Sequence, residues 1–160
     1  QGVSFLDIND YKRIIDQIKS HKLIMLNFHK DGEPLLHKKL PDMVEYAKEK
    51  NAADVIHLNT NGILINNKVG RGIIERGIDD ITVSIDAANK NTYQQLKGID
   101  GFDKLEESIE KIINYRDKIK SNTNIRVKIM EFDEIGKDEI DAFFERWSDI
   151  ADEVQVTGIQ

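Results

Sequence analysis

A short polar corner is the most chemically suggestive feature of this chain: Asp31-Gly32-Glu33-Pro34, which follows an apolar run that begins at Leu23. Glycine lets the backbone turn tightly or approach a ligand closely. Proline favours an extended conformation for the residue before it, so the carboxylate and carbonyl of Glu33 would be presented. Such a corner suits the capture of an ammonium group. Taken alone, the tetrapeptide is more simply a strand-to-helix turn.

Two more polar stretches follow later apolar runs. The sequence Asn-Thr-Asn-Gly at positions 59–62 offers polar side chains that suit a ribose or a carboxylate, although Asn-Gly is also a common turn signal. Ser84 and Asp86 alternate with apolar residues, which predicts that both side chains lie on one face of a strand. There they could bind ribose hydroxyls or an amino acid moiety. As buried core residues they would instead need polar partners.

The elements that position these residues can be read from periodicity. Apolar or β-branched runs predict strands at 23–26, 55–58, 81–85, 125–129 and 154–157. Apolar residues three and four apart predict helices at 11–18, 40–47, 102–113 and 140–150. A helix at 69–76 is weaker because Gly70 and Gly72 each cost about 1 kcal/mol relative to alanine.

Strands that alternate with helices are typical of right-handed βαβ units. They predict one α/β domain with a parallel sheet of about five βα units, buried on both faces. In such folds ligands bind beyond the carboxyl ends of the strands, and all three polar stretches are placed there.

Composition narrows the class of protein. The formal charge of −6 and the scattered basic residues disfavour nucleic acid and an anionic membrane surface. The apolar runs are far shorter than the ~20 residues of a membrane span, and no signal segment opens the sequence, so we expect a cytoplasmic protein. The ten acidic residues between Glu131 and Glu153 predict a solvated outer helix face rather than a cation site.

Metal sites have little support in the residues. The chain has no cysteine, which excludes disulfides, thiolate zinc sites and cysteine-held iron–sulfur clusters within these residues. The four histidines fall on different predicted elements and lack the i, i+4 helical pairing of metal-binding histidines. We therefore expect no histidine metal centre.

In their order along the chain, several segments resemble the radical S-adenosylmethionine (radical SAM) enzymes. They are the Gly-Glu-Pro corner, then "TNG", "VSIDA", "TYQQLKGIDGFDKLEESIEKI" and "FFERWSDIADEVQV". The resemblance covers essentially the whole chain and looks like the SPASM-type subgroup, in which an auxiliary cluster-binding extension follows the barrel. It implies that this chain is a fragment of a partial TIM-like (β/α)6 barrel.

The resemblance also implies a role for the first polar corner. Gly32, Glu33 and Pro34 match the motif that binds the amino group of the methionine moiety of S-adenosylmethionine. Asp31 stands where the family usually has the first glycine of this motif. The backbone contacts of that position are therefore expected to differ from the family pattern.

The other two polar stretches match cofactor-facing positions of the family. Asn59 and Thr60 match polar positions that face S-adenosylmethionine. Ser84, and with it Asp86, matches the strand position that holds the methionine carboxylate or the ribose. The cofactor-binding set implied by the resemblance is thus Gly32, Glu33, Pro34, Asn59, Thr60, Ser84 and Asp86.

The family's three-cysteine loop, Cys-x3-Cys-x2-Cys, does not occur in the chain. The resemblance therefore implies that residues 1–160 are a core-domain fragment that lacks the first strand with its cluster loop and the C-terminal extension. In the parent enzyme a 4Fe-4S cluster, reduced by a flavodoxin or ferredoxin, would cleave S-adenosylmethionine to a 5′-deoxyadenosyl radical that abstracts hydrogen from a peptide, sugar or small-molecule substrate. The fragment alone is expected to be inactive and to bind the cofactor weakly at most.

Two other interpretations remain open at this point. The chain could be a complete, non-enzymatic βα binding or scaffold domain with a ligand at the same strand ends. An exposed edge at the first strand, with self-association measured by sedimentation, would favour a fragment over that interpretation. A barrel-type enzyme that handles phosphate ranks last, because Gly136 and Gly158 are too isolated to form a glycine-rich anion site.

Overall fold

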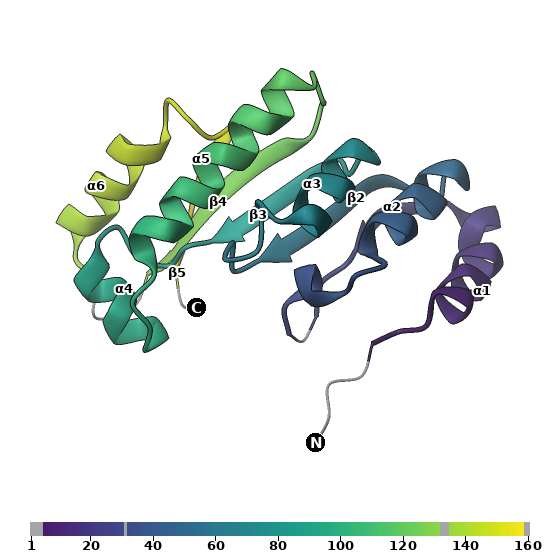
Figure 1. Ribbon diagram of the computed structural model, residues 1–160, viewed down its shortest axis with the longest axis horizontal. Coiled ribbons are helices and arrows are strands. Elements are labelled where there is room, and N and C mark those ends of the chain that lie inside the picture. Colours follow the sequence, from purple (N-terminus) through teal and green to yellow (C-terminus); the bar gives the residue numbers. More distant parts are fainter. Residues whose placement is uncertain (1–4, 31, 132–134, 159–160) are drawn as a thin grey trace.

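The fold is seen in a computed structural model, which describes residues 5–30, 32–131 and 135–158 (Figure 1). The strands are β1 (Leu23–Asn27), β2 (Ala53–Thr60), β3 (Asp80–Ser84), β4 (Asn124–Glu131) and β5 (Glu153–Gly158). The helices are α1 (Ile8–Ile18), α2 (Leu40–Glu49), α3 (Lys68–Glu75), α4 (Lys90–Lys97), α5 (Phe102–Lys118) and α6 (Lys137–Trp147). Short 3-10 turns cover Lys19–His21 and Pro34–Leu36.

The strands form one parallel sheet in the order β1-β2-β3-β4-β5. Strand and helix alternate along the chain, so the predicted α/β fold with about five βα units is confirmed. The first and last strands do not pair with each other, and the sheet is therefore open rather than closed into a barrel.

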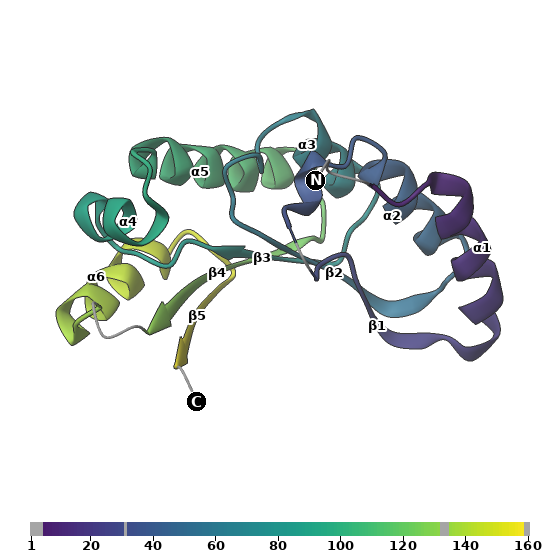
Figure 2. The same ribbon diagram turned by 90° about the horizontal axis from the view of Figure 1, so that it is seen from below.

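The helices cover only one side of the sheet. Figure 2 shows the sheet as an arch, with helices along its outer side and the inner, concave side open. On the outer side, apolar strand residues such as Ile56, Ile81 and Val127 are fully buried in the core. The alternation along β4 places Arg126 and Lys128 on the opposite, half-buried side.

The prediction of a sheet buried on both faces is therefore wrong. The inner face carries polar side chains at paired positions: Thr82 lies opposite Arg126, and Ser84 lies opposite Lys128. An alternation of apolar and polar residues buries one face and leaves the other polar, whereas a doubly covered strand has a continuous apolar run. The polar face is where the candidate site lies.

Helix α4 has no counterpart among the predicted helices. Its sequence is mostly polar and buries only Thr92 and Tyr93, so it gives almost no apolar period. Its ends carry the signal instead: the Asn89 side chain accepts a hydrogen bond from the Thr92 backbone N–H, and Gly98 ends the helix at φ +70°.

The two glycines that weaken the prediction of α3 have a packing role. A Cβ atom on Gly70 would lie 1.8 Å from the carbonyl oxygen of Ile65. A Cβ atom on Gly72 would lie 2.9 Å from Cγ of Pro41, on helix α2. The two glycines therefore lower helix propensity, but they let α3 lie close to the Ile65 carbonyl and to Pro41. The side chain of Asn67 stabilises the start of the helix by accepting hydrogen bonds from the N–H groups of Val69 and Gly70.

Strand β1 is an edge strand, as expected. Ile24 is 84% exposed and Met25 is 50% exposed, so the apolar character of this strand is only partly used in the core. Within the described ranges, no helix combines the length and the apolar character that crossing a membrane requires.

Candidate functional site

Glu33 ties together the ends of two neighbouring strands. Its Oε1 atom accepts hydrogen bonds from the Thr60 hydroxyl (2.7 Å) and the Leu35 backbone N–H (3.1 Å). Its Oε2 atom accepts from the backbone N–H of Asn61 (2.9 Å). All three donors are neutral, and among the described residues no cation pairs with this carboxylate. Its negative charge is available to a ligand that carries a positive one.

The backbone of this corner has the conformation that the sequence indicates. Glu33 is extended (φ −103°, ψ 110°), as the following proline favours. Gly32 adopts φ +87°, a left-handed conformation that favours glycine. Asp31, expected to alter the backbone contacts of the corner, lies outside the described residues.

A polar cavity of about 400 Å³ opens beside this corner, at the carboxyl ends of the strands. Its lining residues come from the ends of β1, β2 and β3, from within β4 and from helix α4: His29, Gly32, Glu33, Asn59, Thr60, Asn61, Ser84, Lys97 and Lys128. The volume lies within the range of small-molecule sites. Five of the seven predicted binding residues meet here, whereas Pro34 and Asp86 do not line it.

Two lysines supply the positive charge of the cavity. Lys128 lies opposite Ser84 in the register of β3 and β4, and within the described part of the chain it has no ion-pair partner. From the sequence, Lys128 could be dismissed as an ordinary exposed lysine; the pairing with Ser84 is the signal that identifies it. Lys97, at the end of α4, was missed entirely because no local pattern distinguishes it.

Asp86 holds Lys97 rather than lining the cavity. Strand β3 ends at Ser84, so the alternation that would place both side chains on one face does not reach Asp86. Asp86 is left-handed (φ 58°), and its Oδ2 atom lies 2.8 Å from Nζ of Lys97. Its Oδ1 atom is buried without a hydrogen-bond partner among the described residues. Burial raises the pKa of nearby Tyr93, and the negative charge of Asp86 raises it further.

The cavity offers groups that suit a zwitterionic ligand with hydroxyls. Glu33 is an uncompensated carboxylate, and Lys128 is an ammonium group without an ion-pair partner in the described ranges. Oδ1 of Asn59 is buried and accepts no hydrogen bond from any described residue, so a ligand donor would satisfy it. An amino acid moiety attached to a ribose presents these complementary groups.

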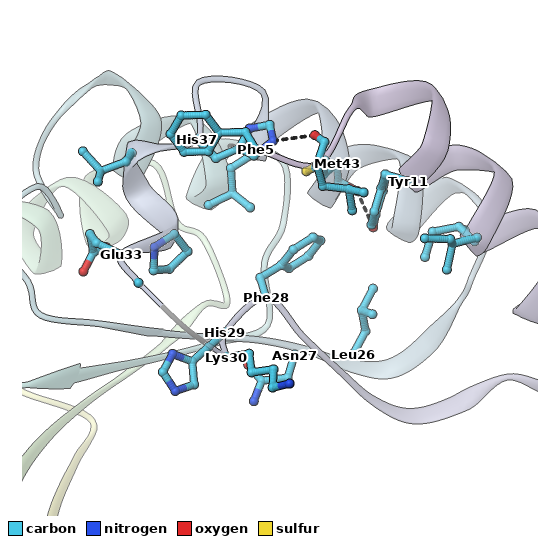
Figure 3. Close-up of a pocket in the computed structure, with 17 residues that line it drawn as sticks. Phe5, Tyr11, Leu26, Asn27, Phe28, His29, Lys30, Glu33, His37 and Met43 are labelled. Carbon is cyan, nitrogen blue, oxygen red and sulfur yellow. Dashed lines mark hydrogen bonds between the residues drawn. The ribbon is translucent and has the colours of Figure 1, made fainter. Parts of the chain in front are cut away.

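An apolar cavity of about 550 Å³ adjoins the polar one and shares His29, Gly32 and Glu33 with it (Figure 3). Phe28 points into it, toward Met43, whereas Asn27, His29 and Lys30 point to the other side of the strand. Its remaining lining includes Phe5, Leu6, Tyr11, Pro34 and Leu36. Phe28 thus lines the apolar cavity alone, whereas His29, Gly32 and Glu33 line both cavities.

The wall of the apolar cavity is fixed by hydrogen bonds from the side chains of Tyr11 and His37. The Tyr11 hydroxyl donates to the Met43 carbonyl (3.0 Å), and burial raises the pKa of Tyr11 well above its usual range. The His37 ring donates from Nε2 to the carbonyl of Leu6 (2.9 Å) and accepts at Nδ1 from the backbone N–H of Lys39 (3.1 Å). The Tyr11 contact joins α1 to α2, and the contact between His37 and Leu6 attaches the segment that precedes α1 to the turn after Pro34.

The inner face of the sheet also carries a partly buried polar cluster. The His57 ring lies 3.1 Å from Thr82 Oγ1 and 3.7 Å from Asp80 Oδ2. Arg126 contacts Asp80 (3.1 Å) and Glu153 (2.7 Å). Burial lowers the pKa of His57; Asp80 acts in the opposite direction, and Arg126 adds to the lowering.

This cluster predicts a loss of stability in acid. The folded protein binds the His57 proton less tightly than the unfolded chain, whose histidine pKa is about 6.5. The contribution of a neutral His57 is therefore fully present above that value and is lost as the pH falls through the lower, folded pKa. We expect the free energy of unfolding, measured with urea, to fall as the pH drops below about 6.5, and to fall less in H57Q. Equal pH dependence in both proteins would contradict this.

The described residues contain no group of three or more His, Asp or Glu side chains placed to hold a metal ion. His21, His29, His37 and His57 do not converge on one point: the first lies in the turn after α1, and His37 and His57 are each engaged in contacts of their own.

The sequence of this chain is similar to a known protein family and to individual proteins of known name. The family profile described as the Radical SAM superfamily matches residues 2–136. A GTP 3′,8-cyclase of Chlorobaculum tepidum is 24% identical over 140 residues, and a probable GTP 3′,8-cyclase of Metallosphaera sedula is 30% identical over 151 residues. Each match covers 88% of this chain but only 40% and 45% of the relative. The chain thus spans less than half the length of these relatives.

Solved structures with the same fold cover the whole chain. SuiB of Streptococcus suis, bound to the precursor peptide SuiA, gives a TM-score of 0.78 at 14% identity and is covered over 34% of its length. Methylornithine synthase (PylB) gives 0.71 at 13% identity and is covered over 46% of its length. At these identities the likeness shows the fold, in which the open sheet corresponds to part of a TIM-like barrel.

Proposed function

Because the chain belongs to the radical SAM superfamily, whose members use S-adenosylmethionine and a 4Fe-4S cluster, we propose that its polar cavity binds S-adenosylmethionine. The observation that carries this proposal is the meeting of Glu33, Ser84 and Lys128 at one set of strand ends, with opposite charges uncompensated in the described residues. When bound to a reduced cluster, this cofactor supplies a 5′-deoxyadenosyl radical for hydrogen abstraction.

Different residues of the cavity bind different parts of S-adenosylmethionine in this proposal. Glu33, on the corner formed with Gly32 and Pro34, takes the methionine ammonium, because its carboxylate keeps a free acceptor site beside three neutral donors. Ser84 takes the carboxylate together with Lys128 and Lys97. Asn59 meets a ribose hydroxyl with its free Oδ1, while Thr60 and Asp86 act through Glu33 and Lys97, respectively.

The 4Fe-4S cluster has no ligands in this chain: residues 1–160 contain no cysteine, and no group of described residues could replace three thiolates. We assign its ligands to a part of the whole protein outside these residues and treat residues 1–160 as a core-domain fragment. The shared length with the cyclase relatives, 40–45% of theirs, supports this assignment. Reading the gene upstream of the Gln1 codon for Cys-x3-Cys-x2-Cys tests it directly, and a coding sequence without that motif would sink the radical mechanism.

Cofactor binding can be measured on the chain itself. We expect S-adenosylmethionine to bind weakly and to shift NMR signals of residues around Ser84. The variant S84A should weaken binding at least tenfold, because a hydrogen bond to a charged group contributes about 1.5–3 kcal/mol. S148A, which removes an exposed hydroxyl at the end of α6, is the matched control and should bind like the wild type. Shifts that avoid the cavity would refute the assignment.

Catalysis by the chain alone is not expected. After incubation with iron, sulfide, a chemical reductant and S-adenosylmethionine, chromatography should detect no 5′-deoxyadenosine above a protein-free control. The whole protein, treated in the same way, should produce it. Turnover by residues 1–160 would show that the fragment interpretation is incorrect.

The class of substrate would distinguish two subgroups of the superfamily, one that acts on a nucleotide and one that acts on a peptide. The sequence relatives act on GTP according to their names, so a nucleotide is the first substrate to test. The likeness to peptide-bound SuiB keeps a peptide substrate and the SPASM-type assignment in view as the second. A sugar or another small molecule comes next, and a flavodoxin or ferredoxin would serve as the reductant. A non-enzymatic binding domain remains the alternative, which the absence of the three-cysteine motif would favour.

A further inference from the structure

We propose that Glu139, on helix α6, is a positioning residue for the cofactor cavity: it fixes the turn after β3 and thereby holds the Lys97 ammonium at the cavity wall. The inference deepens the proposed function and rests on it for the identity of the ligand. It concerns a residue that the sequence assigns to a solvated acidic face.

Glu139 lies on the inward side of α6. It is four residues before Phe143 and eight before Trp147, both of which are fully buried in the core. Residues at this spacing share one face of a helix. Its acidic neighbours on the same helix, Asp141 and Glu145, are exposed. The packing of α6 therefore directs the carboxylate of Glu139 toward the interior.

Both oxygens of this carboxylate hold the segment between β3 and α4. Oε1 accepts from the backbone N–H of Ala88 (2.8 Å), and Oε2 accepts from the hydroxyl of Thr92 (2.8 Å). Thr92 is only 7% exposed, and its hydroxyl also accepts a hydrogen bond from Nδ2 of Asn89 (3.2 Å). Figures 1 and 2 both show α6 next to α4 at one end of the molecule.

The turn held in this way contains the residue that carries Lys97. Asp86 is left-handed without being glycine, a conformation that persists where surrounding contacts enforce it. On one side, Ile85 N–H donates to the Lys128 carbonyl (3.0 Å); on the other, Glu139 holds Ala88. Between these two anchors the Asp86 carboxylate pairs with Lys97, whose side chain is about a third exposed at the cavity.

A chain of contacts thus connects helix α6 to the cavity, from Glu139 through the turn and Asp86 to Lys97. Each link is a hydrogen bond between residues distant in sequence or a backbone constraint. Loss of the first link would release the turn, relax Asp86 and free the Lys97 side chain. The predicted consequence is a loss of order at Lys97 without loss of the fold.

The test compares four variants by two readouts. In E139A both hydrogen bonds are lost, in T92V one is lost, and in E139Q an amide can still accept from Ala88 and contact Thr92. E145A removes an exposed carboxylate from the same helix and is the matched control. The first readout, on the ligand-free protein, is the 15N NMR signal of the Lys97 ammonium and its hydrogen exchange rate. The second is the dissociation constant of S-adenosylmethionine.

We expect the Lys97 signal to be protected in the wild type, E139Q and E145A, weakened in T92V and lost in E139A. The dissociation constant should rise about tenfold in E139A and about threefold in T92V, and stay within about twofold in E139Q, because a Lys97 ammonium that is no longer held in place loses its charged hydrogen bond to the ligand. An unprotected Lys97 in the wild type, or the same protection in E139A, would overturn the inference. Protection that follows this order without any binding of S-adenosylmethionine would support the positioning role and reject the proposed ligand.

Discussion

Replacing Glu33 with alanine is expected to lower the free energy of unfolding by about 2–4 kcal/mol and to abolish measurable binding of S-adenosylmethionine. The stability effect arises because the Thr60 hydroxyl and the N–H groups of Leu35 and Asn61 lose a charged acceptor together. These donors come from two strand ends, so the change loosens the connection between β1 and β2 at the cavity. Urea unfolding and NMR titration measure the two effects separately.

Two further variants separate the charge of Glu33 from its hydrogen bonds. E33Q keeps an oxygen acceptor but loses the negative charge, so we expect it to recover part of the stability while the cofactor still binds at least tenfold more weakly. E49A, at the exposed end of α2, removes a carboxylate far from the strand ends and should change neither quantity. If E33A unfolded like the wild type, Glu33 would not connect the strands as its contacts indicate.

Replacing Gly62 with alanine is expected to destabilise the fold by about 2–4 kcal/mol. Gly62 adopts φ +78°, which costs a residue with a side chain about 1 kcal/mol or more. In addition, a Cβ atom there would lie 2.6 Å from both Leu105 Cδ1 and Val83 Cγ1. The methyl group would press α5 away from β3, and the neighbouring Asn59–Asn61 segment would shift at the cavity.

Gly98 provides the control for this substitution. It has a similar backbone conformation, φ +70°, but a Cβ atom there would meet no atom within 4 Å. G98A should therefore cost only about 1 kcal/mol, the contribution of the left-handed conformation. Thermal or urea unfolding of both variants isolates the packing term. Equal decreases in the free energy of unfolding in G62A and G98A would show that contact with Leu105 and Val83 does not contribute to the destabilisation.

For both glycines the sequence predicts a turn, but it does not predict what surrounds the glycine. A glycine in "TNG" or at the end of a helix indicates a turn in either case. Only the structure shows that Gly62 is enclosed by α5 and β3 while Gly98 faces open space. The same limit applies to Gly70, which reads as a weak point of a helix and proves to permit contact with the Ile65 carbonyl.

The sequence by itself determined the strands, most helices and their assembly into a parallel sheet, and it placed the polar stretches directly after strands. It also determined the extended conformation of Glu33, because Pro34 restricts its immediate neighbour. These properties depend on residues close together in the chain, whose apolar period and backbone preferences are visible as a pattern. Helix α4 was missed because its polar sequence lacks that pattern.

The tertiary structure decided which groups meet. The bonds of Glu33 to Thr60 and Asn61, the pairing of Lys97 with Asp86, and the contacts of Glu139 with Ala88 and Thr92 join residues 11 to 51 positions apart. Such contacts follow from strand register and helix packing, which local preferences do not specify. For the same reason the open polar face of the sheet emerged only once the helices were seen to cover a single side.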